Sequence, residues 1–372
     1  MIIEVDKSAS GQDLHAIRQT IEGAGYTSHL DRGDEVTLVG VHGRAIPESL
    51  EDAIRKLPGV MKILRITDSY KEVSRKFHPS NTVITLENGA KIGAGELTLM
   101  VGPCGVENYS LVLETAYWAK EAGAQVLRGG AFKPRTGPYS TQGMGEAGLE
   151  ILARVKQETG LPIITEILIP QDENVSVGQV IAMFERYGMD IYQVGARSAQ
   201  VGGLLHALSK RNHPVLYKNG LGMTAEEFLN GAEYLLSGAW GDDGSDGGGN
   251  PNVMLCVRGT AGETTVSRFP LDLNWIPYLR KKAHLPIIAD PSHSSGKWWM
   301  VVDSSLAAIA AGAGGLEIEV HPDPKIAKSD DKQAIGLEQL MEIATVGREI
   351  FNARKALKPD YRMTNHYVDR PA

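Results

Sequence analysis

Eight short apolar segments, each ending at a glycine or a polar residue, constrain the fold more than any other feature. They alternate with stretches of helical periodicity over about 260 residues, which is the size and rhythm of an α/β fold of the (β/α)8 barrel (TIM barrel) type. A doubly wound open sheet, which usually has fewer repeats, is the alternative. The expected strands end at Gly102, Gly129, Glu166, Gly195, Lys218, Arg258, Asp290 and Val320. The expected helices include 110–122, 147–159, 225–237, 301–311 and 337–353.

Residues 1–67 have a different pattern, which predicts a separate small domain. Strands are expected at 2–5, 26–30, 36–41 and 60–66, with one helix after Ser10 and another from Pro47. This β-α-β-β-α-β order is that of a ferredoxin-like domain. It is either a packing or oligomerisation module, or a ligand-sensing regulatory domain. We expect a connector with a small hairpin at 68–95, the barrel at 96–356 and a C-terminal tail at 357–372.

Composition excludes several classes of function. The 372 residues include 38 Lys and Arg and 45 Asp and Glu, a formal net charge of −7. This balance argues against a nucleic-acid partner, which needs a basic surface. No apolar run approaches the roughly 20 residues that span a bilayer, so no membrane partner is expected. The N-terminus lacks the pattern of a secretory signal, and two cysteines provide no disulfide framework. We therefore expect a cytoplasmic protein.

Potential metal ligands follow three of the expected strands. Cys104 follows the first strand, His293 follows the seventh, and Glu319 lies at the end of the eighth, with Asp330 in the next loop. In a barrel these positions share one rim, and thiolate, imidazole and carboxylate together can bind a divalent transition metal. The alternative is that Cys104 is a small buried residue and His293 a hydrogen-bonding group. No short CxxC-type spacing decides between these interpretations.

Positive charges also gather at the strand ends of this acidic chain. They follow or end strands two, four, five and six, at Arg128, Lys133, Arg135, Arg197, Lys218 and Arg258. Arginine presents a planar fork that suits phosphate and carboxylate, and lysine adds a point charge. Scattered solvated charges would not explain why strand ends carry cations so consistently. We expect a pocket for one or two phosphorylated substrates.

Five sequence blocks together resemble those of one enzyme family. They are residues 102–107, 127–136, 195–197, 290–293 and 318–322. In this order and spacing they are similar to the 3-deoxy-D-arabino-heptulosonate 7-phosphate (DAHP) synthases of the type I beta group. The resemblance extends from the small domain to about residue 356. It implies a transferase that condenses phosphoenolpyruvate with erythrose 4-phosphate and releases phosphate, the first step of the shikimate pathway to the aromatic amino acids.

The resemblance also implies roles for individual residues. The metal ligands would be Cys104, His293, Glu319 and Asp330, with Mn²⁺ favoured and Co²⁺, Fe²⁺ or Zn²⁺ as alternatives. Lys133 would be a general acid, although a metal-bound water could take that role. Phosphoenolpyruvate would be held by Arg128, Lys133, Arg197, Lys218 and Arg258. Erythrose 4-phosphate would be held by Arg135 and Thr136, with Pro134 shaping the loop.

For the small domain, the resemblance implies feedback by tyrosine or phenylalanine, and for the whole chain a homotetramer. The sequence departs from the family at Val257, where this subgroup usually has Glu, and at Trp298-Trp299, where a charged run is usual. These departures leave open a different aldose phosphate in a specialised biosynthetic pathway. Two further alternatives are a Schiff-base aldolase that uses Lys218 and an inactive barrel that carries an amino-acid sensor.

Overall fold

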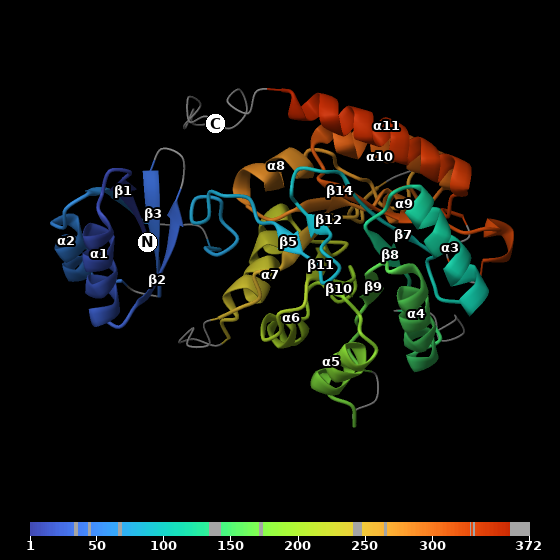
Figure 1. Ribbon diagram of the computed structural model, residues 1–372, viewed down its shortest axis with the longest axis horizontal. Helices are drawn as coiled ribbons and strands as arrows, with labels where there is room; N and C mark the ends of the chain where they lie inside the picture. Colours follow the sequence, from blue (N-terminus) through green and yellow to red (C-terminus); the bar gives the residue numbers. More distant parts are fainter. Residues whose placement is uncertain are drawn as a thin grey trace.

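The chain folds into a small N-terminal domain and a closed barrel, which lie beside each other in the computed structural model (Figure 1). The structure describes residues 1–32, 36–43, 46–65, 69–133, 143–170, 174–240, 248–263, 266–327, 329 and 332–357. Within these ranges, no helix combines the length and apolar character needed to cross a membrane.

The N-terminal domain is a four-stranded antiparallel sheet with two helices, as the sequence predicts. The strand order is β2-β3-β1-β4, and the sheet packs against α1 and α2 through Ile3, Val39, Ile17 and Ile54. The expected capping box of Ser10 begins α1. The elements are β1 (Ile2–Asp6), α1 (Gly11–Gly23), β2 (Thr27–Arg32), β3 (Val36–His42), α2 (Glu48–Arg55) and β4 (Val60–Leu64).

Eight parallel strands close into the barrel, and all eight expected strands are present. The barrel closes where β14 pairs with β7. The strands are β7 (Thr98–Gly102), β8 (Val126–Arg128), β9 (Ile163–Glu166), β10 (Ile191–Val194), β11 (Val215–Lys218), β12 (Val253–Val257), β13 (Ile287–Ala289) and β14 (Gly315–Glu319). The predicted hairpin forms from β5 (Ile84–Thr85) and β6 (Lys91–Ile92). Its Ile84 and Ile92 pack on the apolar interior of the barrel, which includes Met100, Met254 and Cys256.

Helices surround the barrel and begin and end where the sequence provides caps (Figure 1). A capping box at Thr224 begins α7, and Gly238 ends it in the left-handed conformation that favours glycine. The helical elements are α3 (Tyr109–Glu121), α4 (Glu146–Thr159), α5 (Val177–Arg186), α6 (Gly202–Ser209), α7 (Ala225–Ser237), α8 (Trp275–Lys282), α9 (Pro291–Ser295), α10 (Trp298–Ala311), the short 3-10 turn η1 (Pro324–Ile326) and α11 (Leu337–Lys355).

Histidines from three parts of the chain meet around Glu72 where the small domain joins the barrel. His42 of β3 lies 2.7 Å from a carboxylate oxygen of Glu72, and His78 of the connector lies 3.2 Å from the other. The ring of His284, just before β13, contacts the Glu72 carbonyl at 2.7 Å. His29 contacts His42 at 3.0 Å. Burial lowers the pKa values of His29 and His284 to about 4, so both rings are neutral at pH 7.

Candidate active site

The chemistry-bearing residues meet at the rim formed by the carboxyl ends of the barrel strands. Arg128 ends β8, Lys218 ends β11 and Glu319 ends β14. Cys104 follows β7, and His293 lies in α9, which begins directly after β13. Because parallel strands of a barrel all end on the same face, residues far apart in the sequence come together here.

Cys104, His293 and Glu319 form a group that can hold a metal ion. One ligand atom from each lies within 4.8 Å of the other two. Asp290 caps α9 and accepts from the backbone N–H of His293 at 3.0 Å, while its Oδ2 lies 2.7 Å from His293 Nδ1. This contact turns Nε2 toward Glu319, whose Oε1 is 3.3 Å away. A carboxylate behind the histidine is the usual support for a metal ligand. The donor set therefore fits a divalent transition metal.

Two buried cations are each paired with two carboxylates at this rim. Lys218 Nζ lies 2.7 Å from Asp290 and 2.7 Å from Glu317. Arg128 contacts Glu317 at 3.1 Å and also pairs with Glu319. Burial opposes both positive charges, but the carboxylates outweigh it and raise the pKa values of Arg128 and Lys218 above their ordinary range. Lys218 is therefore an ammonium group, which disfavours the Schiff-base alternative.

The Glu319 carboxylate is fixed by contacts on both oxygens. Gln333 donates to its Oε2 at 2.6 Å, and Arg128 and His293 both contact its Oε1. The Ser292 hydroxyl also accepts from the backbone N–H of Glu319 at 3.0 Å. Burial alone would favour the neutral acid. The charges of His293 and Arg128 outweigh burial and hold the pKa of Glu319 well below its usual range. Glu319 is thus an oriented carboxylate, the state that a metal ligand requires.

Lys133 is a buried cation directly beside the candidate metal ligand Cys104. Its Nζ lies 2.8 Å from the Cys104 sulfur and also donates to the Cys104 carbonyl. A cation next to a sulfur stabilises the thiolate, the form that binds metals. Lys133 therefore lies at the candidate metal group, where a proton could be delivered.

Arg258 provides a buried cation on the β12 side of the rim. Its backbone N–H donates to Asn219 at 2.8 Å, and its guanidinium lies 4.4 Å from the ring centre of Phe269. Nη1 is buried and has no hydrogen-bond partner among the described residues. Burial lowers the pKa of this guanidinium; the charge of Asp290 opposes this shift, and the charges of Arg268 and Arg197 add to it. A buried donor among other cations is suited to an anionic substrate group.

Eight of the twelve predicted site residues lie at the carboxyl ends of the barrel strands or in the segments that follow those strands. They are Cys104, Arg128, Lys133, Arg197, Lys218, Arg258, His293 and Glu319. Arg197 is exposed in the loop after β10. Pro134, Arg135, Thr136 and Asp330 lie outside the described residues. Trp298 and Trp299 are about half exposed and line a cavity of about 680 Å³ with Lys332 and Gln339.

Sequence reasoning gave no site role to three residues that organise this rim. Asp290 orients His293, Glu317 bridges Arg128 and Lys218, and Gln333 fixes Glu319. Glu317 could have been found, because a charged residue two positions before Glu319 in a strand points to the same interior face. Nothing in the local sequence distinguishes Gln333, which reaches the site from the loop after β14.

Comparisons with known proteins agree with this architecture. The family model of the DAHP synthetase I family matches residues 81–356, and that of the DAHP synthase ferredoxin-like domain matches residues 1–68. A phospho-2-dehydro-3-deoxyheptonate aldolase of Thermotoga maritima is 39% identical over 355 residues, covering 95% of this chain and 98% of the relative. A 2-dehydro-3-deoxyphosphooctonate aldolase of Polaromonas naphthalenivorans is 30% identical over 260 residues, covering 65% of this chain and 86% of the relative.

Solved structures show the same relationship. A crystal structure of the Thermotoga maritima DAHP synthase superposes with a TM-score of 0.69 at 37% identity, covering 95% of this chain and 97% of that one. A truncated form of the Thermotoga maritima enzyme gives a TM-score of 0.66 at 40% identity, covering 77% of this chain and 98% of that one. Because the family models, the sequence relative and the fold all agree, the chain belongs to the DAHP synthetase I family and is a transferase of the DAHP synthase class.

Proposed function

We propose that the chain condenses phosphoenolpyruvate with erythrose 4-phosphate to give DAHP and phosphate, and that it depends on a divalent metal. The observation that carries this proposal is the meeting of Cys104, His293 and Glu319 beside buried cations on the catalytic face of the barrel. Asp330 would be the fourth ligand. A metal bound there would supply Lewis acidity toward the aldehyde oxygen. The mixed sulfur, nitrogen and oxygen donors can bind several divalent transition metals. Among these the family resemblance favours Mn²⁺, with Co²⁺, Fe²⁺ or Zn²⁺ as alternatives.

The cations of this face would position phosphoenolpyruvate. Arg258 offers the buried Nη1 donor, and the exposed Arg197 adds charge nearby. Arg128 favours the ionised form of Glu319, and Lys218 favours that of Asp290; both cations would share their remaining donors with the substrate. Lys133 would complete this set, and Arg135 and Thr136, in the loop shaped by Pro134, would hold the aldose phosphate. Clustered cations lower the repulsion between two polyanionic substrates and hold them in reacting orientation.

The proposed reaction balances without a redox partner. The C3 carbon of phosphoenolpyruvate attacks the aldehyde carbon, a carbon–carbon bond forms, and the aldehyde oxygen takes a proton. Lys133 Nζ, held at Cys104, would supply that proton. Water then adds to C2 and loses a proton. The C2–oxygen bond to phosphate then breaks as the new C2 hydroxyl gives its proton to the departing phosphate, which leaves the ketone of DAHP and inorganic phosphate.

We also propose that the N-terminal domain senses an aromatic amino acid, tyrosine or phenylalanine, and that the enzyme is a homotetramer in the cytoplasm. Support for the sensing role is the joint around Glu72, where side chains of this domain contact the connector and the connector contacts the barrel. Through that joint a ligand bound to the small domain could change its fit to the barrel. Binding of tyrosine with no effect on turnover would contradict this role.

A second candidate is the same condensation with another aldose phosphate. The relatives named 2-dehydro-3-deoxyphosphooctonate aldolase favour it, because they match most of the barrel at 26–30% identity. The departures at Val257 and Trp298-Trp299 favour it as well. The much higher coverage by the Thermotoga maritima relative favours erythrose 4-phosphate.

Phosphate release from phosphoenolpyruvate, measured with a panel of aldose phosphates, separates these candidates. We expect the highest kcat/KM with erythrose 4-phosphate and no release without an aldose. A preference for arabinose 5-phosphate would establish the second candidate. Release of phosphate with no aldose dependence would contradict both.

A further inference from the structure

A cavity of about 760 Å³ lies at the end of the barrel opposite to the catalytic face. Its lining includes residues just before β7, β13 and β14, which lie at the amino ends of these strands. The other walls come from the connector, from α8 and from the last turn of α11. The cavity therefore belongs to a part of the molecule to which the proposed condensation assigns no role.

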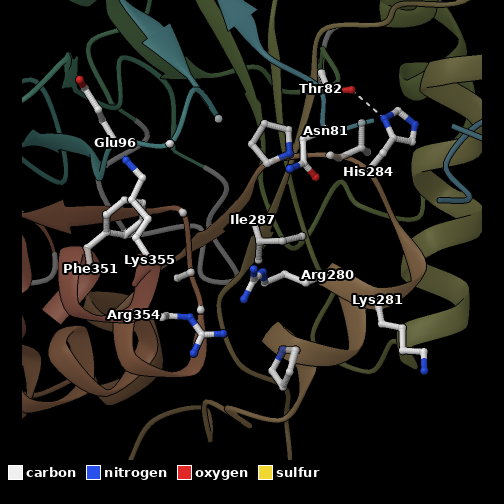
Figure 2. Close-up of a pocket in the computed structure, with 18 of the residues that line it drawn as sticks. Asn81, Thr82, Glu96, Arg280, Lys281, His284, Ile287, Phe351, Arg354 and Lys355 are labelled. Carbon is white, nitrogen blue, oxygen red and sulfur yellow. Dashed lines mark hydrogen bonds between the residues drawn. The ribbon is translucent and has the colours of Figure 1, made fainter. Parts of the chain in front are cut away.

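The cavity gathers positive charge. Among the described residues that line it, the cations are Arg75, Arg280, Lys281, Arg354 and Lys355, and the one carboxylate is Glu96. Figure 2 shows Arg280 and Arg354 extending toward one another from α8 and α11, while Lys281 points away. A Cβ atom at Gly312 would lie 2.6 Å from Arg280 Nη1 and 2.5 Å from Arg354 Nη2. Because glycine has no side chain, both guanidinium groups can pack against the backbone of residue 312.

A structural role explains part of this arrangement. Cations at helix C-termini complement the helix dipole, and Arg354 donates to the Ala310 carbonyl at 2.8 Å. Arg75 similarly donates to the Arg280 carbonyl at 2.9 Å. These contacts fix the direction of individual side chains, but they do not explain why like charges from three segments converge. Burial lowers the pKa of Arg75, and the charge of Arg280 lowers it further, so these two cations lie close enough to repel each other.

We propose that this cavity binds a small organic anion, with a phosphate or carboxylate group between Arg280 and Arg354. Two guanidinium forks suit either oxyanion. Phe351 and Pro277 supply an apolar wall for the body of the ligand, and the volume lies within the range of small-molecule sites. A ligand there would contact α8, α11 and the connector at once.

The site also lies next to the joint between the small domain and the barrel. Thr82, on the cavity wall, hydrogen-bonds His284 at 2.7 Å, and the other ring nitrogen of His284 contacts the Glu72 carbonyl (Figure 2). Occupancy of the cavity would therefore stabilise the connector where it meets the barrel. We expect the ligand to raise the thermal stability of the full-length protein.

A tungstate soak of crystals of the full-length protein locates anion sites directly, because tungsten scatters anomalously. We expect one peak at the catalytic face and a second between Arg280 and Arg354. The double variant R280Q/R354Q should lose the second peak and keep the first. A catalytic-face peak in wild-type crystals with none at the cavity would overturn the proposal, whatever becomes of the proposed condensation.

A solution measurement does not depend on crystals. Inorganic phosphate and malonate are titrated separately against the wild type, R280Q/R354Q and the control K56Q/K62Q, which removes two exposed charges from the small domain. The apparent affinity for one of these anions, obtained from the rise in melting temperature, should fall about tenfold in R280Q/R354Q and stay unchanged in the control. The anion that responds identifies the class of head group. Equal responses in all three proteins would contradict the site. If R280Q/R354Q fails to fold, R280K/R354K preserves charge and should show an intermediate loss.

Discussion

The two ends of the barrel arrange positive charge in different ways. At the catalytic face, Arg128 and Lys218 each contact two carboxylates. At the opposite end, five cations and one carboxylate line the cavity among the described residues. Paired charges at the first end are part of the folded structure, so removing one partner leaves the other buried and uncompensated. At the second end the cations are half-buried or exposed, so removing one costs the fold less, and we expect binding to suffer rather than folding.

Cys104→Ala has the largest expected effect, because it removes a metal ligand, while Lys133 keeps its hydrogen bond to the backbone carbonyl of residue 104. We expect turnover to fall on the order of 10³-fold, since the Lewis acid would be lost. The free energy of unfolding should change by only about 1–2 kcal/mol. Phosphate-release kinetics, metal content by mass spectrometry and urea unfolding measure the three quantities. A variant that keeps both its metal and its turnover would remove Cys104 from the ligand set.

Lys218→Met tests the paired end of the barrel. It leaves Asp290 and Glu317 buried without their shared cation, and we expect the free energy of unfolding to fall by about 3–5 kcal/mol. Lys156→Met is the matched control, because Lys156 pairs with Asp190 at the same 2.7 Å but is 28% exposed. The control should cost about 1 kcal/mol or less. If urea unfolding showed similar losses for the two variants, burial would not determine how much these ion pairs contribute to the free energy of unfolding.

The histidine joint sharpens the comparison, because burial keeps two of its rings, those of His29 and His284, without charge at pH 7. His284 faces Glu72, His78 and Arg75, and burial is the main reason for its low pKa of about 4. The unfolded chain binds this proton below about pH 6.5, and the folded chain binds it only near pH 4. The contribution of neutral His284 to the free energy of unfolding is therefore complete above about pH 6.5. It is lost as the pH falls from 6.5 toward 4, by about 3 kcal/mol for His284 alone. Unfolding followed from pH 7 to 4.5 should show this loss, and His284→Gln should flatten the curve. An unchanged slope in the variant would contradict the assignment.

R280Q/R354Q has the smallest expected effect on the reaction. Neither side chain lies at the catalytic face, so kcat/KM should stay within about twofold of the wild type. The free energy of unfolding without added anion should change by about 1 kcal/mol or less. Steady-state kinetics and urea unfolding check both values. A large loss of turnover would show that the two ends of the barrel are coupled in the unliganded enzyme.

Patterns along the chain were enough to predict the barrel, because eight repeats of strand and helix have few alternative packings. Residues at strand ends, such as Lys218 and Glu319, were predictable for the same reason. The ion pairs that those residues form could not be predicted, because they depend on which strand ends face each other across the closed barrel. Gln333 and the convergence of Arg280 with Arg354 depend on loops and helix ends that periodicity does not place. For these, only the three-dimensional structure supplies the contact.

The central claim is that the catalytic face carries out a metal-dependent condensation. Its most direct test is phosphate release from phosphoenolpyruvate and erythrose 4-phosphate before chelation, after removal of metal verified by mass spectrometry, and after addition of Mn²⁺. We predict that turnover disappears on chelation and returns with Mn²⁺ in the wild type, and that Mn²⁺ does not restore it in Cys104→Ala. Undiminished turnover in verified metal-free enzyme would contradict the account.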